Sequence, residues 1–193
     1  MLAPWRSLLS SAIHRNRSQP HARYFQLATV TPQGYPANRT VVFRGFDNDQ
    51  DNSLKIITDA RSSKIQDIEY QSQAEICWYF TKTREQFRLA GNLLLVTDTV
   101  EEHHLQQARQ KTWQQISDSA RSQFAWPDPA QPAADQSAFE VATPDANNPL
   151  ANFCLLLLTP HKVDHLQLRG NPQQRCFYLL QTDQTWTTQL VNP

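Results

Sequence analysis

The sequence predicts a mainly β protein of the α+β class with peripheral helices, folded as one domain over residues 1–193. Three observations predict this class. Runs rich in β-branched and aromatic residues recur along the chain and make about eight strands, separated by Pro, Gly, Asn and Asp. Only three segments space their apolar residues as a helix does. The chain has 193 residues, 39% of them hydrophobic, which is enough to bury one core. An antiparallel barrel with helices packed on its outside is the simplest architecture.

The first three predicted strands form a meander with short connections. Residues 24–30 are strand-like, and the next four residues, 31–34, have Pro early and Gly late, as a turn requires. The chain then returns over 37–46. After a polar loop at 47–52 it runs back over 54–58. Neighbouring strands joined in this way pair antiparallel.

Further strand-like runs follow in the second half of the chain. Residues 86–97 can form either one hairpin or one long bulged strand around Gly91. Pro and Gly separate the last runs. The predicted strands are 74–80, 86–90, 93–97, 152–159, 161–169, 175–181 and 186–191.

Three segments have helical periodicity. Residues 5–15 form an amphipathic first helix. Residues 59–70 form a second, in which Ser63-Lys64-Ile65-Gln66 fits a capping box. A second capping box at 99–102 opens a third helix. Its apolar side consists of Leu105, Ala108, Thr112, Trp113 and Ile116.

Composition excludes several classes of function. There are 18 Lys and Arg against 18 Asp and Glu, so the zero net charge disfavours nucleic-acid binding. No apolar run has the length of a membrane span, and residues 1–6 lack the pattern of a secretory signal. The three cysteines read as buried free thiols, and His103-His104 lack the spacing of a metal pair. We therefore predict a cytoplasmic protein with no metal, no nucleic-acid partner and no membrane contact.

One long irregular excursion is expected at 126–149. It contains Pro127, Pro129, Pro132, Pro144 and Pro149. Loops of this length in compact domains are usually functional or disordered.

Residues 38–44, Asn-Arg-Thr-Val-Val-Phe-Arg, place a permanent charge near each end of an apolar strand. A core strand has no use for Arg39 and Arg44, whereas a strand along an elongated anionic ligand can use both. Five residue steps span about 16 Å, roughly the reach from a phosphate to the far edge of a tricyclic ring. Because residues five apart face opposite sides of a regular strand, they can share a ligand only through a bulge, an end effect or a subunit boundary.

A second group of anion-binding side chains is predicted at the start of the second helix. Thr58, Ser62 and Ser63 offer hydroxyls and Lys64 an ammonium where free N–H groups already favour an anion. The alternative is that Ser63 only caps the helix and Lys64 is solvated. The four glycines of the chain form neither a P-loop nor a dinucleotide-binding turn. A phosphate would therefore be held by side chains and a helix end.

A third candidate is the strand at 86–90. Alternation places Gln86, Arg88 and Ala90 on one face. The Gln86 amide both donates and accepts, so it could bond a planar heterocycle. The alternative is an ordinary exposed strand face.

Together these motifs resemble the pyridoxamine 5′-phosphate oxidases, and most closely the related branch found in cyanobacteria and plants. The resemblance covers nearly the whole chain, and the order and spacing of the motifs carry it. The motifs are 39–44, 57–58, 62–64, 86–91, Arg175 and 186–193, with 4–6, 37–46 and 75–80 typical of the branch. The resemblance implies an FMN-binding split barrel that forms a homodimer with FMN at the subunit interface.

The resemblance also implies roles for individual residues. Arg39 would serve the FMN phosphate, with Lys64 and the residue before it completing that site. Arg44 would lie near the flavin and the substrate, and Arg175 would reach the flavin from the C-terminal strands, which makes these two the catalytic candidates. The implied cofactor-binding residues are Arg39, Thr40, Val41, Val42, Arg44, Ile57, Thr58, Ser62, Ser63, Lys64, Gln86 and Arg175.

The chain departs from the oxidase pattern mainly on the substrate side. Ser63 stands where the oxidases have an Arg, and 171–174 lacks their substrate-holding Arg and His. Of a substrate-binding Tyr, Arg and Ser on one helix, only Ser122 stands in a matching place, with Arg121 as a candidate replacement. The sequence thus predicts FMN binding and a small-molecule substrate whose identity it leaves open.

The predicted function is that of an FMN-dependent oxidoreductase of the pyridoxamine 5′-phosphate oxidase type, in which the flavin performs the redox chemistry and the protein supplies orientation and charge. Two alternatives keep the flavin: an NAD(P)H-dependent flavin reductase, and a non-catalytic FMN-binding or sensing protein. A third is a barrel that binds an oligonucleotide or haem instead.

Overall fold

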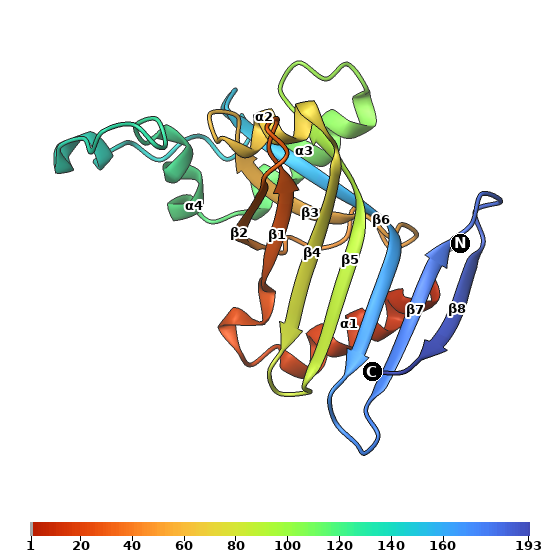
Figure 1. Cartoon of the computed structure of the whole chain (residues 1–193). Helices are drawn as coiled ribbons and strands as arrows, with labels where there is room; N and C mark the ends of the chain where they lie inside the picture. Colours follow the sequence, from red (N-terminus) through yellow and green to blue (C-terminus); the bar gives the residue numbers. More distant parts are fainter. Residues whose placement is uncertain (1) are drawn as a thin grey trace.

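A computed structural model describes residues 2–193, and its centre is one antiparallel sheet (Figure 1). The prediction of a mainly β protein with peripheral helices is confirmed. The strands are β1 (Tyr24–Val30), β2 (Pro36–Val42), β3 (Leu54–Asp59), β4 (Gln73–Phe80), β5 (Glu85–Val96), β6 (Phe153–Gln167), β7 (Gln174–Leu180) and β8 (Trp186–Val191). The α-helices are α1 (Pro4–Asn16), α2 (Lys64–Tyr70), α3 (His103–Gln115) and α4 (Asp118–Ser122).

Strand β6 connects the two parts of the sheet. Seven strands follow the order β2-β1-β4-β5-β6-β7-β8, and β3 lies off this path and pairs with β6. The first half of β6 pairs with β3, from Phe153 to Leu158, and its second half pairs with β7, from Lys162 to Gln167. Because β3 and β7 occupy the same edge of β6 at different heights, the sheet splits there into two wings.

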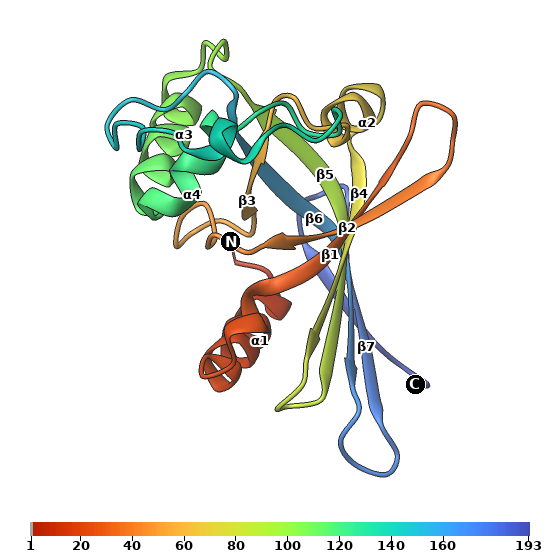
Figure 2. The same cartoon turned by 90° about the vertical axis from the view of Figure 1, so that its left-hand side faces the viewer.

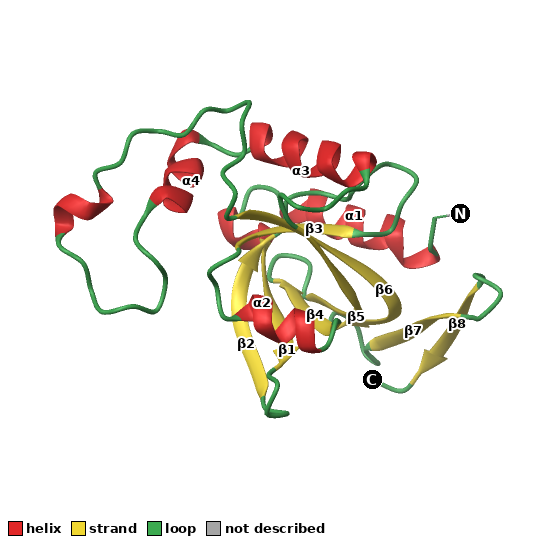
Figure 3. Ribbon diagram, turned by 90° about the horizontal axis from the view of Figure 1, so that it is seen from above, coloured by secondary structure: helices red, strands yellow, loops and turns green. Residues whose placement is uncertain are grey.

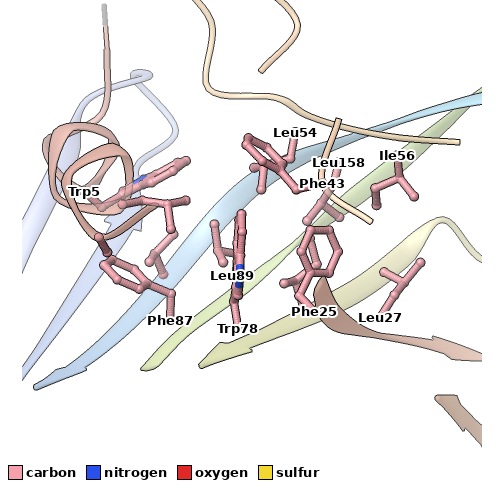
Figure 4. Close-up of a cluster of buried hydrophobic side chains, with 14 of the residues drawn as sticks. Trp5, Phe25, Leu27, Phe43, Leu54, Ile56, Trp78, Phe87, Leu89 and Leu158 are labelled. Atoms are coloured by element: carbon pink, nitrogen blue, oxygen red, sulfur yellow. The ribbon is translucent and has the colours of Figure 1, made fainter. Parts of the chain in front are cut away.

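The core lies on one face of this sheet, under α1. Strand alternation directs Phe87 and Leu89 of β5 inward, while Arg88 between them is exposed. Trp78 is fully buried at the centre, with the rings of Phe25, Phe43 and Phe80 about it at centroid distances of 4.9–5.0 Å (Figure 4). Its indole nitrogen donates to the Ala22 carbonyl at 3.0 Å, so the burial leaves no polar atom of this side chain unpaired.

Where β6 pairs with β7, the face of β5, β6 and β7 opposite the core carries no helix in the part of the chain that the structure describes. Helix α3 packs on this side farther along the strands, on Val96, Leu155 and Leu157. Figure 2 shows α1 on one side of these strands and the second side open beside β7. Cross-strand register lines up Gln86, Leu166 and Arg175 in one row on the open face. The neighbouring row contains Arg88 and Asp164. We call this surface the open sheet face.

Strand β2 is shorter than predicted, which changes the position of Arg44. The expected strand over 37–46 ends at Val42. Beyond it the chain leaves β1 and turns toward β3, where the Arg44 N–H donates to the Lys55 carbonyl at 2.9 Å and the Lys55 N–H donates to Gly45 at 2.8 Å. Gly45 has φ +105°, a conformation that suits glycine and makes this change of direction possible.

Both predicted capping boxes are wrong. Helix α2 begins at Lys64, with a turn before it, and the Ser63 side chain makes no capping hydrogen bond. Helix α3 begins after Glu102, whose side chain likewise caps nothing. The Gln106 amide instead donates to carbonyls of the loop before the helix, those of Thr97, Asp98 and Val100. A side chain one turn inside the helix thus orders the preceding loop.

The structure decides one open alternative and removes one predicted strand break. Residues 86–97 form the single bulged strand of the two alternatives, and 152–159 and 161–169 merge into β6 despite Pro160. The register shift lies between Ala90 and Gly91, opposite Lys162 and Pro160, so the bulge takes up the residue between them. A proline without an N–H is tolerated at such a bulge.

The predicted three-strand meander is correct for β1 and β2 but wrong for β3, which pairs with β6 and meets the segment after β2 at the isolated Phe46–Leu54 bridge. The prediction of buried cysteines is wrong at Cys77, which is partly exposed. The other segments agree with the sequence interpretation, with one addition. Residues 126–149 are irregular apart from one 3₁₀ turn at Gln136–Phe139, while the short helix α4 was not predicted. The three cysteines are free, and Cys154 and Cys176 are buried. Within residues 2–193, no helix combines the length and apolar character needed to cross a bilayer.

Candidate functional site

A cavity of about 620 Å³ lies between β2, β3, the start of α2 and the excursion. Figure 3 shows the excursion and α4 reaching out on the side of β2 and α2. A volume of this size falls in the range of small-molecule and cofactor sites. Its lining includes Arg39, Thr40, Val41, Val42, Arg44, Ile57, Thr58, Ser62 and Lys64, nine of the predicted cofactor residues.

Three cations form what we call the basic floor: Arg39, Arg44 and Lys64. They come from β2, from the turn after it and from the first residue of α2. In a net-neutral protein such a group favours an anion in the cavity.

Side chains of the protein hold the Arg39 guanidinium on the side away from the cavity. Its Nη1 donates to the Thr29 hydroxyl at 2.6 Å, and its Nη2 donates to the buried carboxylate of Asp67 on α2 at 3.2 Å. Thr29 in turn donates to Asp67 at 2.7 Å. These bonds hold the guanidinium in one place at the cavity wall, with 23% of its side chain exposed for a ligand.

Lys64 stands between two hydroxyls. Its Nζ donates to Thr58 Oγ1 at 2.9 Å and to Ser62 Oγ at 2.5 Å. Burial, and then the nearby charge of Arg39, lower the pKa of Lys64 below the ordinary lysine value. An anion in the cavity would offset both effects, because it favours the charged ammonium.

Arg44 faces the cavity from the turn beyond β2. Its Nε is buried without a hydrogen-bond partner among the described residues, and burial lowers its pKa, with a further contribution from Arg23. A buried donor without a partner is costly, so it marks a place where a ligand can accept a hydrogen bond. Because the strand ends at Val42, Arg39 and Arg44 reach one cavity within one chain, through the end effect that was one of the three predicted possibilities.

The sequence interpretation missed the other wall of the cavity. We call it the apolar roof, and it consists of Phe124, Trp126, Pro127, Pro129, Pro132 and Phe139. Trp126 and Phe139 pack edge to face at 5.6 Å and are each 37% exposed. A proline-rich excursion next to two aromatic residues was the available signal in the sequence.

The sequence interpretation also missed the ion pair of Asp59 and Arg61 at the edge of the cavity. Asp59 accepts two bonds from Arg61, at 2.9 Å from Nε and 2.7 Å from Nη2. Burial would raise the pKa of Asp59, but the hydrogen bonds and charge of Arg61 outweigh it and leave that pKa lowered. The same pairing raises the pKa of Arg61. The spacing Asp-x-Arg just before Ser62 was the only local sign.

Three predicted cofactor residues lie outside this cavity. Ser63 points to solvent. Gln86 and Arg175 lie on the open sheet face, in one row with Leu166 between them. Asp164 holds Arg175 through two bonds, from Nε at 3.0 Å and from Nη2 at 2.7 Å. Such bidentate pairing fixes the plane of the guanidinium.

The two predicted substrate residues are occupied within the chain. Arg121 is buried and donates to the carbonyls of Ile116 at 2.7 Å and Trp113 at 3.3 Å, where it satisfies the end of α3, and it pairs with Asp118. Ser122 Oγ donates to the Asp118 carbonyl at 3.0 Å. Neither side chain lines the cavity.

Comparison with known proteins places this geometry in a family. Residues 2–97 match the profile described as "Pyridoxamine 5′-phosphate oxidase, FMN-binding domain". Over its full length the chain is 40% identical to "Pyridoxine/pyridoxamine 5′-phosphate oxidase 2" of Arabidopsis thaliana, of which it covers 98%. The chain belongs to the pyridoxamine 5′-phosphate oxidase-related, FMN-binding family. The resemblance inferred from the motifs is thereby confirmed.

Solved structures of the family share the fold. A pyridoxamine 5′-phosphate oxidase-related, FMN-binding protein from Nostoc punctiforme PCC 73102 is 53% identical, with a TM-score of 0.97 and full coverage of both chains. PhzG from Burkholderia lata 383, solved with tetrahydrophenazine-1-carboxylic acid, is 18% identical and has a TM-score of 0.79. It covers all of this chain and 98% of that one, and at this identity the likeness concerns the fold alone.

FMN is the cofactor of the family, and the cavity fits it. Arg39 and Lys64 of the basic floor, with the hydroxyls of Thr58 and Ser62, suit a phosphate, while the apolar roof suits a flat ring. The unpartnered Nε of Arg44 supplies a further donor. FMN carries both a phosphate and a tricyclic ring, so one ligand can satisfy both walls.

If Lys64 binds the phosphate as an ammonium, FMN affinity should fall with rising pH. Because the pKa of Lys64 is lowered, the cost of burying its charge is present below that pKa and relieved above it, so the stability of the FMN-free protein rises as the pH passes it. FMN affinity changes in the opposite direction, since neutral Lys64 loses a charge-assisted bond worth about 1.5–3 kcal/mol, roughly 10- to 150-fold in Kd. We expect this loss in fluorescence titrations as the pH rises toward the ordinary lysine pKa of 10.5. The variant Lys64→Arg, which stays charged, should show only the change due to the flavin itself, and equal pH profiles would exclude Lys64 from phosphate binding.

Proposed function

We propose that the protein is an FMN-dependent oxidoreductase that oxidises a small phosphorylated amine or alcohol of the pyridoxamine 5′-phosphate type. The observation that carries the proposal is a single cavity with a basic floor and an apolar roof. The full-length similarity to the Arabidopsis protein supports the substrate class.

The residues of the cavity divide into two tasks. Arg39, Lys64 and the hydroxyls of Thr58 and Ser62 would hold the FMN phosphate, because they offer several donors around one point. Arg44 would donate to the ring system or to the substrate. The bound flavin supplies the acceptor for the two electrons that leave the substrate. The protein orients the substrate, excludes water beneath the apolar roof and supplies positive charge.

A homodimer completes the proposed site. Gln86 and Arg175 are implied flavin contacts, yet they lie on the open sheet face and outside the cavity lining of their own chain. A second copy packed on this face would bring them to the flavin. Light scattering should therefore give twice the mass of the chain. A monomer that binds FMN normally would remove these two residues from the site.

The visible spectrum of the purified protein tests the cofactor, and peroxide release tests the chemistry. We expect flavin absorption, or its appearance on adding FMN, and peroxide formation on adding pyridoxamine 5′-phosphate. Unphosphorylated pyridoxamine is the matched control, and it should react far more slowly if the phosphate is recognised. A protein that takes up no FMN contradicts the whole proposal, whereas flavin binding without peroxide from any such amine contradicts only the oxidase activity.

The predicted substrate-binding residues favour a second candidate function. Arg121, the candidate replacement for a substrate-binding residue, is turned toward the end of α3, and 171–174 has no cationic residue. Both observations favour an NAD(P)H-dependent flavin reductase or a non-catalytic flavin-binding protein. Bleaching of the bound flavin by NADPH under argon would identify the reductase. A flavin that neither substrate class reduces would identify the non-catalytic protein.

A further inference from the structure

The contacts of Arg61 join the two walls of the cavity. Arg61 lies in the turn between β3 and α2 and pairs with Asp59, the last residue of β3. Its Nη1 also donates to Asp128 at 2.7 Å and to the Trp126 carbonyl at 3.0 Å. Its Nη2 adds a bond to the Phe124 carbonyl at 3.2 Å. All three of these last partners belong to the segment that carries the apolar roof.

Arg61 differs from the cations of the basic floor in its charge environment. Two carboxylates, Asp59 and Asp128, offset its charge, and its donors are directed at protein acceptors. It therefore has little to offer an anionic ligand. Its side chain is 28% exposed, as expected at the rim of the cavity.

Phe124, the first residue of the roof, is buried against Trp113 and Phe153, but the rest of the roof makes few hydrogen bonds to the protein. In the part of the chain that the structure describes, no hydrogen bond joins residues 129–144 to the rest of the protein. The far end is held where Trp113 Nε1 donates to the Asp145 carbonyl at 2.8 Å and Arg109 donates to Leu150 at 2.7 Å. At the near end, Asn152 shares the Phe124 carbonyl with Arg61. Among the described side chains, Arg61 is the one that hydrogen-bonds to Trp126 and Asp128, just after Phe124.

We propose that Arg61 is a positioning residue that holds the apolar roof over the basic floor and so sets how fast a phosphorylated, ring-bearing ligand leaves the cavity. Loop closure over a site acts mainly on dissociation, because the closed loop must open before the ligand departs. The identity of the ligand as FMN rests on the proposed function. The position of the roof does not.

Chymotrypsin cleavage tests the position of the roof without any ligand. Phe139 is the only aromatic residue in 127–149, and Trp126 is protected by the proline that follows it. We expect Arg61→Ala to speed cleavage after Phe139 about tenfold or more under native conditions. Asp128→Ala should speed it about threefold, because an ion pair with a carboxylate that is 64% exposed contributes modestly. Arg17→Ala, on the surface at the end of α1, is the matched control and should not change the rate.

Stopped-flow fluorescence tests the effect on the ligand, with FMN as the probe. Arg61→Ala should raise the FMN dissociation rate about tenfold and leave the association rate within about twofold of wild type. Asp128→Ala should change dissociation in the same direction by a smaller factor. If Arg61→Ala does not fold, Asp128→Ala decides, since it leaves the Arg61–Asp59 pair intact.

Unchanged cleavage after Phe139 in Asp128→Ala and in any folded Arg61→Ala would overturn the proposal. So would an effect confined to the association rate, which would make Arg61 part of charge recognition. Absence of FMN binding by the wild type would refute the proposed function alone, because the cleavage experiment would still report on the roof.

Discussion

Replacing Arg39 by alanine is expected to weaken FMN binding by about 2–4 kcal/mol, or roughly 30- to 900-fold in Kd. The guanidinium is held by Thr29 and Asp67, so it is already in place before a phosphate arrives. A donor that is already held in place loses little conformational freedom when the phosphate binds, so more of its interaction energy appears as affinity. Titration of the FMN-free protein, followed by flavin fluorescence, measures the change.

The same substitution has a second effect that must be separated from the first. Asp67 is 5% exposed and would lose its only cationic partner in the described chain, which costs about 2–3 kcal/mol of stability when a neighbouring hydroxyl still donates. The double variant Arg39→Ala/Asp67→Asn removes the unpaired charge. It should regain stability but not FMN affinity. An Arg39→Ala protein that is folded and binds FMN as tightly as wild type would place the phosphate elsewhere.

The largest effect on stability is expected at Gly91. A Cβ at this position would lie 2.3 Å from the Thr159 carbonyl oxygen and 2.8 Å from Pro160 Cα, both of them backbone atoms of β6. Backbone cannot move aside as a flexible side chain can, so we expect Gly91→Ala to destabilise the protein by about 3 kcal/mol. The melting temperature should fall by about 6–12 °C for a chain of this size.

Gly34→Ala is the matched control for that experiment. Gly34 has φ +83° in the β1–β2 turn, and a Cβ there would meet no atom within 4 Å. Only backbone strain remains, at about 1–2 kcal/mol. If Gly91→Ala melted at or above the temperature of this control, β5 and β6 would have to be farther apart at the bulge than they are in this structure.

The sequence predicts the positions of those strands and helices whose residue pattern depends only on near neighbours in the chain. Alternation along β4 and β7, and the periodicity of α1, depend on neighbours within a few residues, and these elements occur where they were expected. Pro160 was read as the end of a strand because proline cannot donate to a sheet. The bulge that accommodates it depends on Gly91, far away in the sequence, and no local pattern contains that information.

The two walls of the cavity also differ in whether a local sequence pattern predicts them. Two arginines on an apolar strand are a local anomaly, which is why the basic floor could be predicted. The apolar roof depends on Arg61 reaching Asp128, 67 residues later, and Arg61 alone resembles any solvated arginine. The position of Arg121 on a helix predicts a substrate contact, but the free carbonyls at the end of α3 determine the direction of its side chain.

The pairing of β3 has a consequence for the order of assembly during synthesis. β3 supplies Ile57 and Thr58 to the cavity, and its strand partner is β6, whose pairing residues begin at Phe153. On a ribosome, most of the chain must therefore emerge before β3 can enter the sheet. Pairings this distant form slowly, because a long loop must close first. A nascent chain that stops short of β6 can build the β1–β2 and β4–β5 hairpins yet lack a cofactor cavity, so flavin capture belongs to the last stage of folding.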